Sequence, residues 1–117
     1  MTIAEIVAAH LAAWNAPASE ARARSIAAIY SGDVLVADPG GEYHGHAGVA
    51  KAIDSLPTVP GMSLELSGAV QTVQALSTYS WTVGPAGGPA VVSGRDVIGV
   101  RDGVIESVHV FIDAPQP

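Results

Sequence analysis

The sequence predicts a single α+β domain spanning residues 1–117, a cone in which N-terminal helices pack inside a curved mixed or antiparallel sheet. Three observations support this class. Apolar residues recur at helical spacing in the first half of the chain, whereas they alternate with period two in the second half. An Asp-Gly pair joins the last two alternating runs as a hairpin turn. The length suits one domain with its own core.

Helices are expected in three segments of the first half. The first covers residues 3–15, where an amphipathic stripe includes His10. The second begins at a cap at Ser19 and ends near Gly32. The third covers about residues 47–56 and is closed by prolines. The sequence therefore places its helices before most of its sheet.

Strands are expected in five segments. A short strand at residues 34–38 ends at a Pro-Gly-Gly run. Alternation then marks residues 62–67 and 79–83, and longer strands cover residues 91–100 and 104–112. The Gly-rich loop before the fourth of these is followed by a strand and not by a helix, so it is not predicted to bind phosphate.

The turn at Asp102-Gly103 predicts a residue pair of chemical interest. A two-residue type I′ turn there would pair residues outward from the turn and set Asp96 directly opposite His109. Opposed residues have Cβ atoms ~4.5–5.5 Å apart, so the carboxylate and the imidazole are a candidate acid/base pair. The alternative is a structural ion pair on an exposed face. A shift of one residue would separate the two side chains.

Composition narrows the classes of partner. Hydrophobic residues form 49% of the chain and charged residues 14%, so we expect a pocket or a homodimer interface to hide apolar surface. The net charge of −6 argues against nucleic acid and anionic membranes as partners. The absence of cysteine excludes thiolate chemistry and Cys-based metal sites. Without a signal-peptide pattern or a membrane span, a cytoplasmic location is expected.

Several motifs, taken in order, resemble one family. They are His-Leu-Ala-Ala-Trp-Asn at 10–15, Val-Ala-Asp-Pro-Gly-Gly at 36–41, His-Gly-His-Ala-Gly-Val at 44–49, Gly-Arg-Asp-Val at 94–97 and Arg-Asp-Gly-Val-Ile at 101–105. With these motifs the chain resembles the SnoaL-like and ketosteroid-isomerase-like proteins of the nuclear transport factor two superfamily, over nearly its whole length. That family includes isomerases, cyclases, dehydratases, epoxide hydrolases and proteins without catalysis, so function must come from the site.

The resemblance implies roles for three residues. Asp38 matches the proton-transferring carboxylate of ketosteroid isomerase, and Asp96 matches both its oxyanion-holding acid and the principal acid/base of SnoaL-like cyclases. His10 stands where ketosteroid isomerase carries an oxyanion-binding tyrosine. A carboxylate in an apolar cavity is pushed toward its neutral form and can then donate a proton. The alternatives are a turn-capping role for Asp38 and a hydrogen-bonded core role for His10.

Aromatic residues and two further histidines complete the candidates. Trp14, Tyr30 and Trp81 are candidates to line a substrate cavity, although core packing is the alternative for both tryptophans. His44 and His46 have a spacing that suits metal ligands, but no third ligand is assured, and we predict neither a metal nor a cofactor.

These observations favour one function and leave two others open. The first is cofactor-independent proton transfer on a small, largely apolar molecule by Asp96 and His109, with Asp38 as second acid/base. Isomerisation, cyclisation, dehydration and epoxide opening all fit this chemistry. The alternatives are a non-catalytic binding or assembly module and an accessory subunit that needs a partner. Exposure of Asp96 and His109 to solvent, or their sealing away from any cavity, would favour the module.

Overall fold

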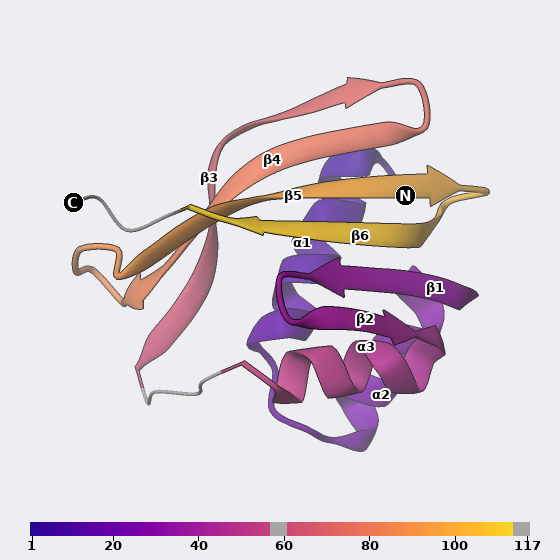
Figure 1. The fold of residues 1–117 in the computed structure, drawn as a ribbon, viewed down its shortest axis with the longest axis horizontal. Coiled ribbons are helices and arrows are strands. Elements are labelled where there is room, and N and C mark those ends of the chain that lie inside the picture. The colour runs from indigo at the N-terminus through magenta and orange to yellow at the C-terminus, as the bar shows by residue number, and fades with distance from the viewer. Residues whose placement is uncertain (57–60, 114–117) are drawn as a thin grey trace.

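The protein is described by a computed structural model that covers residues 1–56 and 61–113, and Figure 1 shows its fold. In this part of the chain the elements are α1 (Ile3–Asn15), α2 (Glu20–Ile29), β1 (Tyr30–Asp38), β2 (Gly41–His44), α3 (Gly45–Asp54), β3 (Met62–Val73), β4 (Leu76–Pro85), β5 (Val92–Arg101) and β6 (Val104–Ile112).

The strands form one mixed sheet in the order β2-β1-β6-β5-β4-β3. Strands β1 and β6 run parallel, whereas the other neighbouring pairs are antiparallel. Three helices packed on such a sheet form an α+β domain with the cystatin-like fold. The predicted fold class is therefore confirmed.

The helices cover one face of the sheet, here called the inner face. Helix α1 passes behind β5 and β6 in Figure 1, while α3 lies beside β2 and α2 packs behind α3. Buried apolar side chains from all three helices join those of the sheet in one core. The sheet contributes its inner-face residues to this core, among them Val36, Tyr79, Trp81, Ile98 and Val108.

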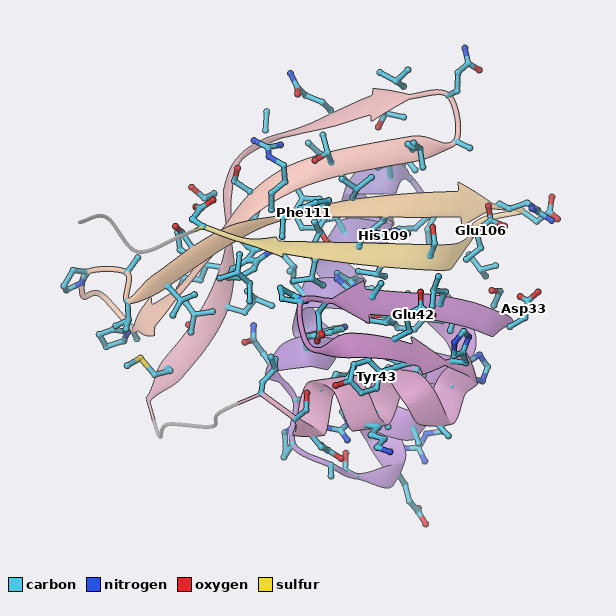
Figure 2. All side chains as sticks on the ribbon, viewed as in Figure 1. Asp33, Glu42, Tyr43, Glu106, His109 and Phe111 are labelled. Atoms are coloured by element: carbon cyan, nitrogen blue, oxygen red, sulfur yellow. The ribbon has the colours of Figure 1, made fainter. Side chains whose placement is uncertain are left out.

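The other face, here called the open face, has no helix on it in the described part of the chain. Strand alternation assigns to this face the residues that lie between the inner-face residues. They include Leu35, Ala37, Thr78, Ser80, Arg95, Val97, His109 and Phe111. Figure 2 shows His109, Phe111 and Glu42 in front of the sheet, on the side away from α1.

Helix α1 begins with a capping box. The Thr2 hydroxyl accepts a hydrogen bond from the Glu5 amide at 3.1 Å, and the Glu5 carboxylate accepts one from the Thr2 amide at 2.9 Å. This reciprocal pair satisfies donors that a helix start would otherwise leave unpaired. At 13 residues, α1 is the longest helix in the described residues, and none of their helices is long and apolar enough to cross a membrane.

Several boundaries differ from the predicted ones: α3 covers Gly45–Asp54, β1 begins at Tyr30, β3 extends to Val73, and β4 covers Leu76–Pro85. Two further differences have a clear cause in the sheet. Helix α2 ends at Ile29 and not near Gly32, because the chain becomes extended at Tyr30, which pairs with Ile105 in the sheet. Strand β2 was not predicted, since its four residues are too few to show alternation. Sheet pairing thus decides where α2 ends and that β2 forms, and such pairing cannot be predicted from the local sequence.

Candidate active site

A buried carboxylate, Asp96, lies at the centre of the inner face. Strand β5 carries it, and only 4% of its surface is exposed. The Tyr79 hydroxyl donates a hydrogen bond to Oδ2 at 2.7 Å, and the Trp81 indole N–H donates one to Oδ1 at 2.9 Å. His10 Nε2 lies 3.3 Å from Oδ2. Neighbouring strand β4 and helix α1 therefore supply three partners for one carboxylate.

The partners of His10 extend this cluster toward the end of α1. Its Nδ1 atom is hydrogen-bonded to the Tyr30 hydroxyl, which also accepts a bond from the Trp14 indole N–H at 3.0 Å. One arrangement satisfies every group: His10 Nε2–H donates to Asp96, and Nδ1 accepts from Tyr30. We call this chain from Trp14 through Tyr30 and His10 to Asp96 the buried relay. Apart from the half-buried Trp14, its members are almost fully buried.

Burial sets the protonation state of the two phenols beside the relay. Removal from water raises the pKa of Tyr30 and of Tyr79 above the usual value of 10, and the nearby Asp96 charge raises both further. Both hydroxyls therefore stay protonated at neutral pH. They act as hydrogen-bond donors, Tyr79 toward Asp96 and Tyr30 toward His10.

A glycine allows Trp81 to reach Asp96. Gly94 is buried and faces the Trp81 ring across the β4–β5 pair. A Cβ atom at position 94 would lie 2.7 Å from Cη2 of Trp81 and closer still to its Cζ2 and to the carbonyl oxygen of Phe111. The bare backbone thus lets the indole lie across β5, with its N–H directed at the carboxylate.

The end of α1 is attached to the sheet by one side chain. The Asn15 amide donates to the Leu64 carbonyl and accepts from the Leu64 N–H, both at 2.8 Å. This two-point attachment fixes the last turn of α1 against β3. Because His10 and Trp14 are four residues apart on that helix, it also positions their rings, whose centroids are 5.5 Å apart.

Asp38 lies on the same face as Asp96. Extending the parallel register of β1 and β6 by one residue places Asp38 beside Val110, which itself pairs with Asp96. The two carboxylates are thus two strands apart, roughly 10 Å. Asp38 Oδ1 accepts from the amides of Gly40 and Gly41 at 2.8 and 3.1 Å, which is the turn-capping role. Among the described residues, Oδ2 accepts no hydrogen bond.

The predicted pairing of Asp96 with His109 is wrong. Asp102 and Gly103 both have positive φ, as a type I′ turn requires, and the two residue pairs next to the turn form as expected. The register then shifts between Gly99 and Val100, with an extra residue on β6, so Asp96 pairs with Val110 and His109 pairs with Val97. His109 is exposed on the open face and is removed from the candidate site.

The two histidines near α3 have separate partners in the described part of the chain. His46 Nε2 is hydrogen-bonded to the Tyr30 carbonyl at 2.8 Å, which ties α3 to β1. His44 is exposed and lies 3.7 Å from Glu42. Within residues 1–56 and 61–113, no group of three His, Cys, Asp or Glu side chains is arranged to hold a metal ion.

Apolar side chains extend the inner face beyond Trp81, where several are half-exposed. Strand register places them in the two rows after the Asp96 row. We call this set the apolar apron, and it consists of Leu64, Leu66, Val83, Val92 and Ile112. Leu66, Val92 and Ile112 are 40–51% exposed. The apron offers an apolar molecule a surface next to the buried relay.

Two features of the site were missed from the sequence. Tyr79 was not named as a site residue, although alternation in β4 sets it on the same face as Trp81, two residues away. The contact between His10 and Asp96 joins residues 86 positions apart. No local sequence pattern predicts a contact over such a separation. His10 and Asp96 were therefore each identified as candidates, but their hydrogen bond was not predicted.

Comparison with known proteins assigns the family. Residues 7–108 match the model of the SnoaL-like domain. A search among curated proteins returned no match to this sequence.

Solved structures share the fold. A candidate isomerase of the SnoaL-like family from Agrobacterium tumefaciens is 26% identical with a TM-score of 0.85, over 95% of this chain and 97% of the other. A candidate ketosteroid isomerase from Kribbella flavida is 18% identical with a TM-score of 0.72, over 97% and 79%. A candidate polyketide cyclase from Sinorhizobium meliloti is 15% identical with a TM-score of 0.70, over 91% and 93%. By its sequence match, the chain belongs to the SnoaL-like domain family.

Proposed function

We propose that the protein binds a small, largely apolar molecule on the apolar apron and catalyses cofactor-independent proton transfer through the buried relay. Membership of the SnoaL-like family and the likeness to a candidate isomerase support an enzymatic role of this general type. The observation that carries the specific proposal is the contact of buried Asp96 with buried His10, whose second nitrogen meets a phenol.

Binding would use surface that the fold leaves exposed beside the relay. Half-exposed aliphatic side chains gain free energy when an apolar ligand covers them, about 25 cal/mol for each Å² removed from water. Trp14 is the half-buried member of the relay, and its indole N–H donates to the Tyr30 hydroxyl. A ligand that displaces the Trp14 N–H would place its own acidic C–H or O–H group against the Tyr30 oxygen, whose proton is donated to His10.

Proton transfer would follow from the two partners of His10. Nδ1 of His10 is placed to take the proton of the Tyr30 hydroxyl, while the Asp96 carboxylate holds the Nε2–H on the other side of the ring. As that proton moves to Nδ1, the Tyr30 oxygen would take a proton from a carbon acid of the ligand, so that Tyr30 ends protonated and the transferred proton is held on His10. Asp96 stabilises the imidazolium that forms. Isomerisation, aldol-type cyclisation, dehydration and epoxide opening all use these elementary steps.

Asp38 would supply the second acid/base group. Its Oδ1 is held by two backbone amides, which fixes the carboxylate, and Oδ2 remains for a ligand. The half-buried Asp38 side chain lies on the inner face of β1. Strand β6 separates it from Asp96 on β5, and Val110 is the β6 residue between the two carboxylates. A ligand over Val110 would therefore contact both a carboxylate and the relay.

The test combines binding with turnover. Wild type, Asp96→Asn and Asp33→Asn would be screened by thermal shift against steroids, polyketide-like aromatics, terpenoids and epoxides. Bound compounds would then be followed for conversion by mass spectrometry. Asp33 is an exposed carboxylate on β1 and serves as the matched control. We expect conversion by wild type and Asp33→Asn and its loss, by about 100-fold or more, in Asp96→Asn.

One observation favours a second function, a non-catalytic binding module. The buried relay satisfies its own hydrogen bonds, and His10, Tyr30 and Tyr79 are at most 1% exposed. Such a network can serve only to hold α1 on the sheet. Compounds that stabilise wild type and Asp96→Asn equally, without conversion by either, would support this function over catalysis.

A further inference from the structure

The side chain of Trp81 lies between Asp96 and the apolar apron. Strand register places Trp81 in the row that follows Asp96, together with Leu66 and Ile112 of the apron. Its indole crosses β5 over Gly94 and donates to Asp96 Oδ1 at 2.9 Å. Successive rows on one face of a sheet are ~7 Å apart, so the ring occupies the space between the carboxylate and the outer row of the apron.

Exposure to solvent falls abruptly at this ring. The apron residues Leu66, Val92 and Ile112 are 40–51% exposed, whereas Trp81 is 6% exposed and Asp96 is 4% exposed. The row of Trp81 therefore contains both accessible aliphatic side chains and one buried aromatic ring. The surface on which a ligand can rest ends at that ring.

Both carboxylate oxygens of Asp96 already have hydrogen-bond partners. Trp81 donates to Oδ1, while Tyr79 and His10 meet Oδ2. Tyr79 flanks Asp96 within its own row, and His10 covers it from α1. Of the three partners, Trp81 is the one on the side of the apron, so its indole is what separates the carboxylate from that surface.

We propose that Trp81 is a specificity-determining residue: its indole keeps a ligand off Asp96 and confines it to the apron and to the Trp14 side of the buried relay. The inference rests on the proposed function, because it assigns the contact with the ligand to Tyr30 and leaves Asp96 to act through His10. A smaller side chain at position 81 would admit a planar apolar ring against the carboxylate. That ring would have to carry an N–H or O–H donor, because the carboxylate would otherwise lose a hydrogen bond.

The access of a reagent to Asp96 tests this role without any substrate. Dicyclohexylcarbodiimide is an apolar reagent that couples to carboxyl groups, and peptide mapping by mass spectrometry reports which carboxyl groups have reacted. Exposed Asp33 is the reference within each protein. Wild type would be compared with Trp81→Ala and with Leu66→Ala, a matched change in the same row of the inner face. We expect Asp96 to stay unmodified in wild type and Leu66→Ala, and to react at least about tenfold faster in Trp81→Ala.

Added indole distinguishes a local opening from a loosened fold. In Trp81→Ala, indole should fill the vacated space, donate its N–H to Asp96 and protect the carboxylate from the reagent. N-methylindole has the same ring without the N–H and should protect less. Far-ultraviolet circular dichroism would establish that the variant is folded. If Trp81→Ala does not fold, Trp81→Leu, which keeps an apolar side chain in the core, takes its place.

Four results would overturn the proposal. They are modification of Asp96 in wild type at the rate of Asp33, a folded Trp81→Ala protein in which Asp96 does not react, a lack of protection by indole, and equal reaction of Asp96 in Leu66→Ala and Trp81→Ala. None of these measurements depends on conversion of a ligand. Failure of the proposed catalysis would therefore leave this test intact, and failure of this test would leave proton transfer to be tested separately.

Discussion

Gly94→Ala is expected to displace the Trp81 ring from Asp96. The new methyl group would sit 2.7 Å from Cη2 of Trp81 and against the carbonyl oxygen of Phe111. Backbone cannot move away cheaply in the middle of a sheet, so the indole must shift. Its 2.9 Å hydrogen bond to Asp96 would then break and leave a buried carboxylate with one donor fewer.

The expected cost combines two effects. Overpacking a core position costs about 1–3 kcal/mol, and the loss of a hydrogen bond to a charged group costs about 1.5–3 kcal/mol. The free energy of unfolding should fall by about 3 to 5 kcal/mol, which corresponds to about 12 to 20 °C in melting temperature for a chain of this length. Such a loss is a large part of the ~5–15 kcal/mol that stabilises a typical domain.

Urea unfolding followed by tryptophan fluorescence measures both effects. The chain has two tryptophans, and both belong to the site, so the emission of the folded state also reports movement of the indole. Gly32→Ala is the matched control, since a Cβ atom there meets nothing within 4 Å. We expect it to unfold within about 1 kcal/mol of wild type. A Gly94→Ala protein that is equally stable and has unchanged emission would refute the packing argument.

Three further perturbations test the site. Because burial holds the pKa of Tyr30 and Tyr79 above 10 in the folded protein, the unfolded chain loses protons first as pH rises, and the unfolding free energy should fall by about 2 kcal/mol between pH 10 and pH 11. A flat profile over this range in chemical unfolding would contradict the burial of the two phenols. Asn15→Ala removes both bonds to Leu64 and should cost about 1–3 kcal/mol in the same assay, with no loss expected if α1 is held by its core residues alone. Asp96→Asn leaves at least one buried donor without its acceptor and should lower the free energy of unfolding by about 2–4 kcal/mol. A variant more stable than wild type would show that the buried carboxylate destabilises the fold.

Much of the fold could be predicted because its signals are local. The helical stripe of residues 3–15 gave α1 with both ends correct, and the Asp102-Gly103 pair gave the turn between β5 and β6. The apolar alternation of β4 assigned Trp81 to the inner face. These features depend on neighbours within a few residues, where propensity and periodicity act.

The pairing within the site could not be predicted in the same way. One extra residue between Val104 and Ser107 moved His109 to the open face, and nothing in the hairpin sequence except Gly99 indicates the bulge. The true partner of Asp96 is His10, which the packing of α1 on the sheet brings to it. Sequence thus identified which residues are chemically competent, whereas tertiary packing decides which of them meet.

Deuterium exchange tests the central claim most directly. Removal of a proton from carbon is common to isomerisation, aldol-type cyclisation and dehydration, so ketones that bind the protein should exchange their α-protons in D₂O even when no net reaction follows. Proton NMR would compare wild type, Asp96→Asn and Asp33→Asn on the same bound ketones. The account predicts exchange by wild type and Asp33→Asn at least about 100-fold faster than by Asp96→Asn. Exchange that is equal in all three proteins, or no faster than in buffer, would contradict it.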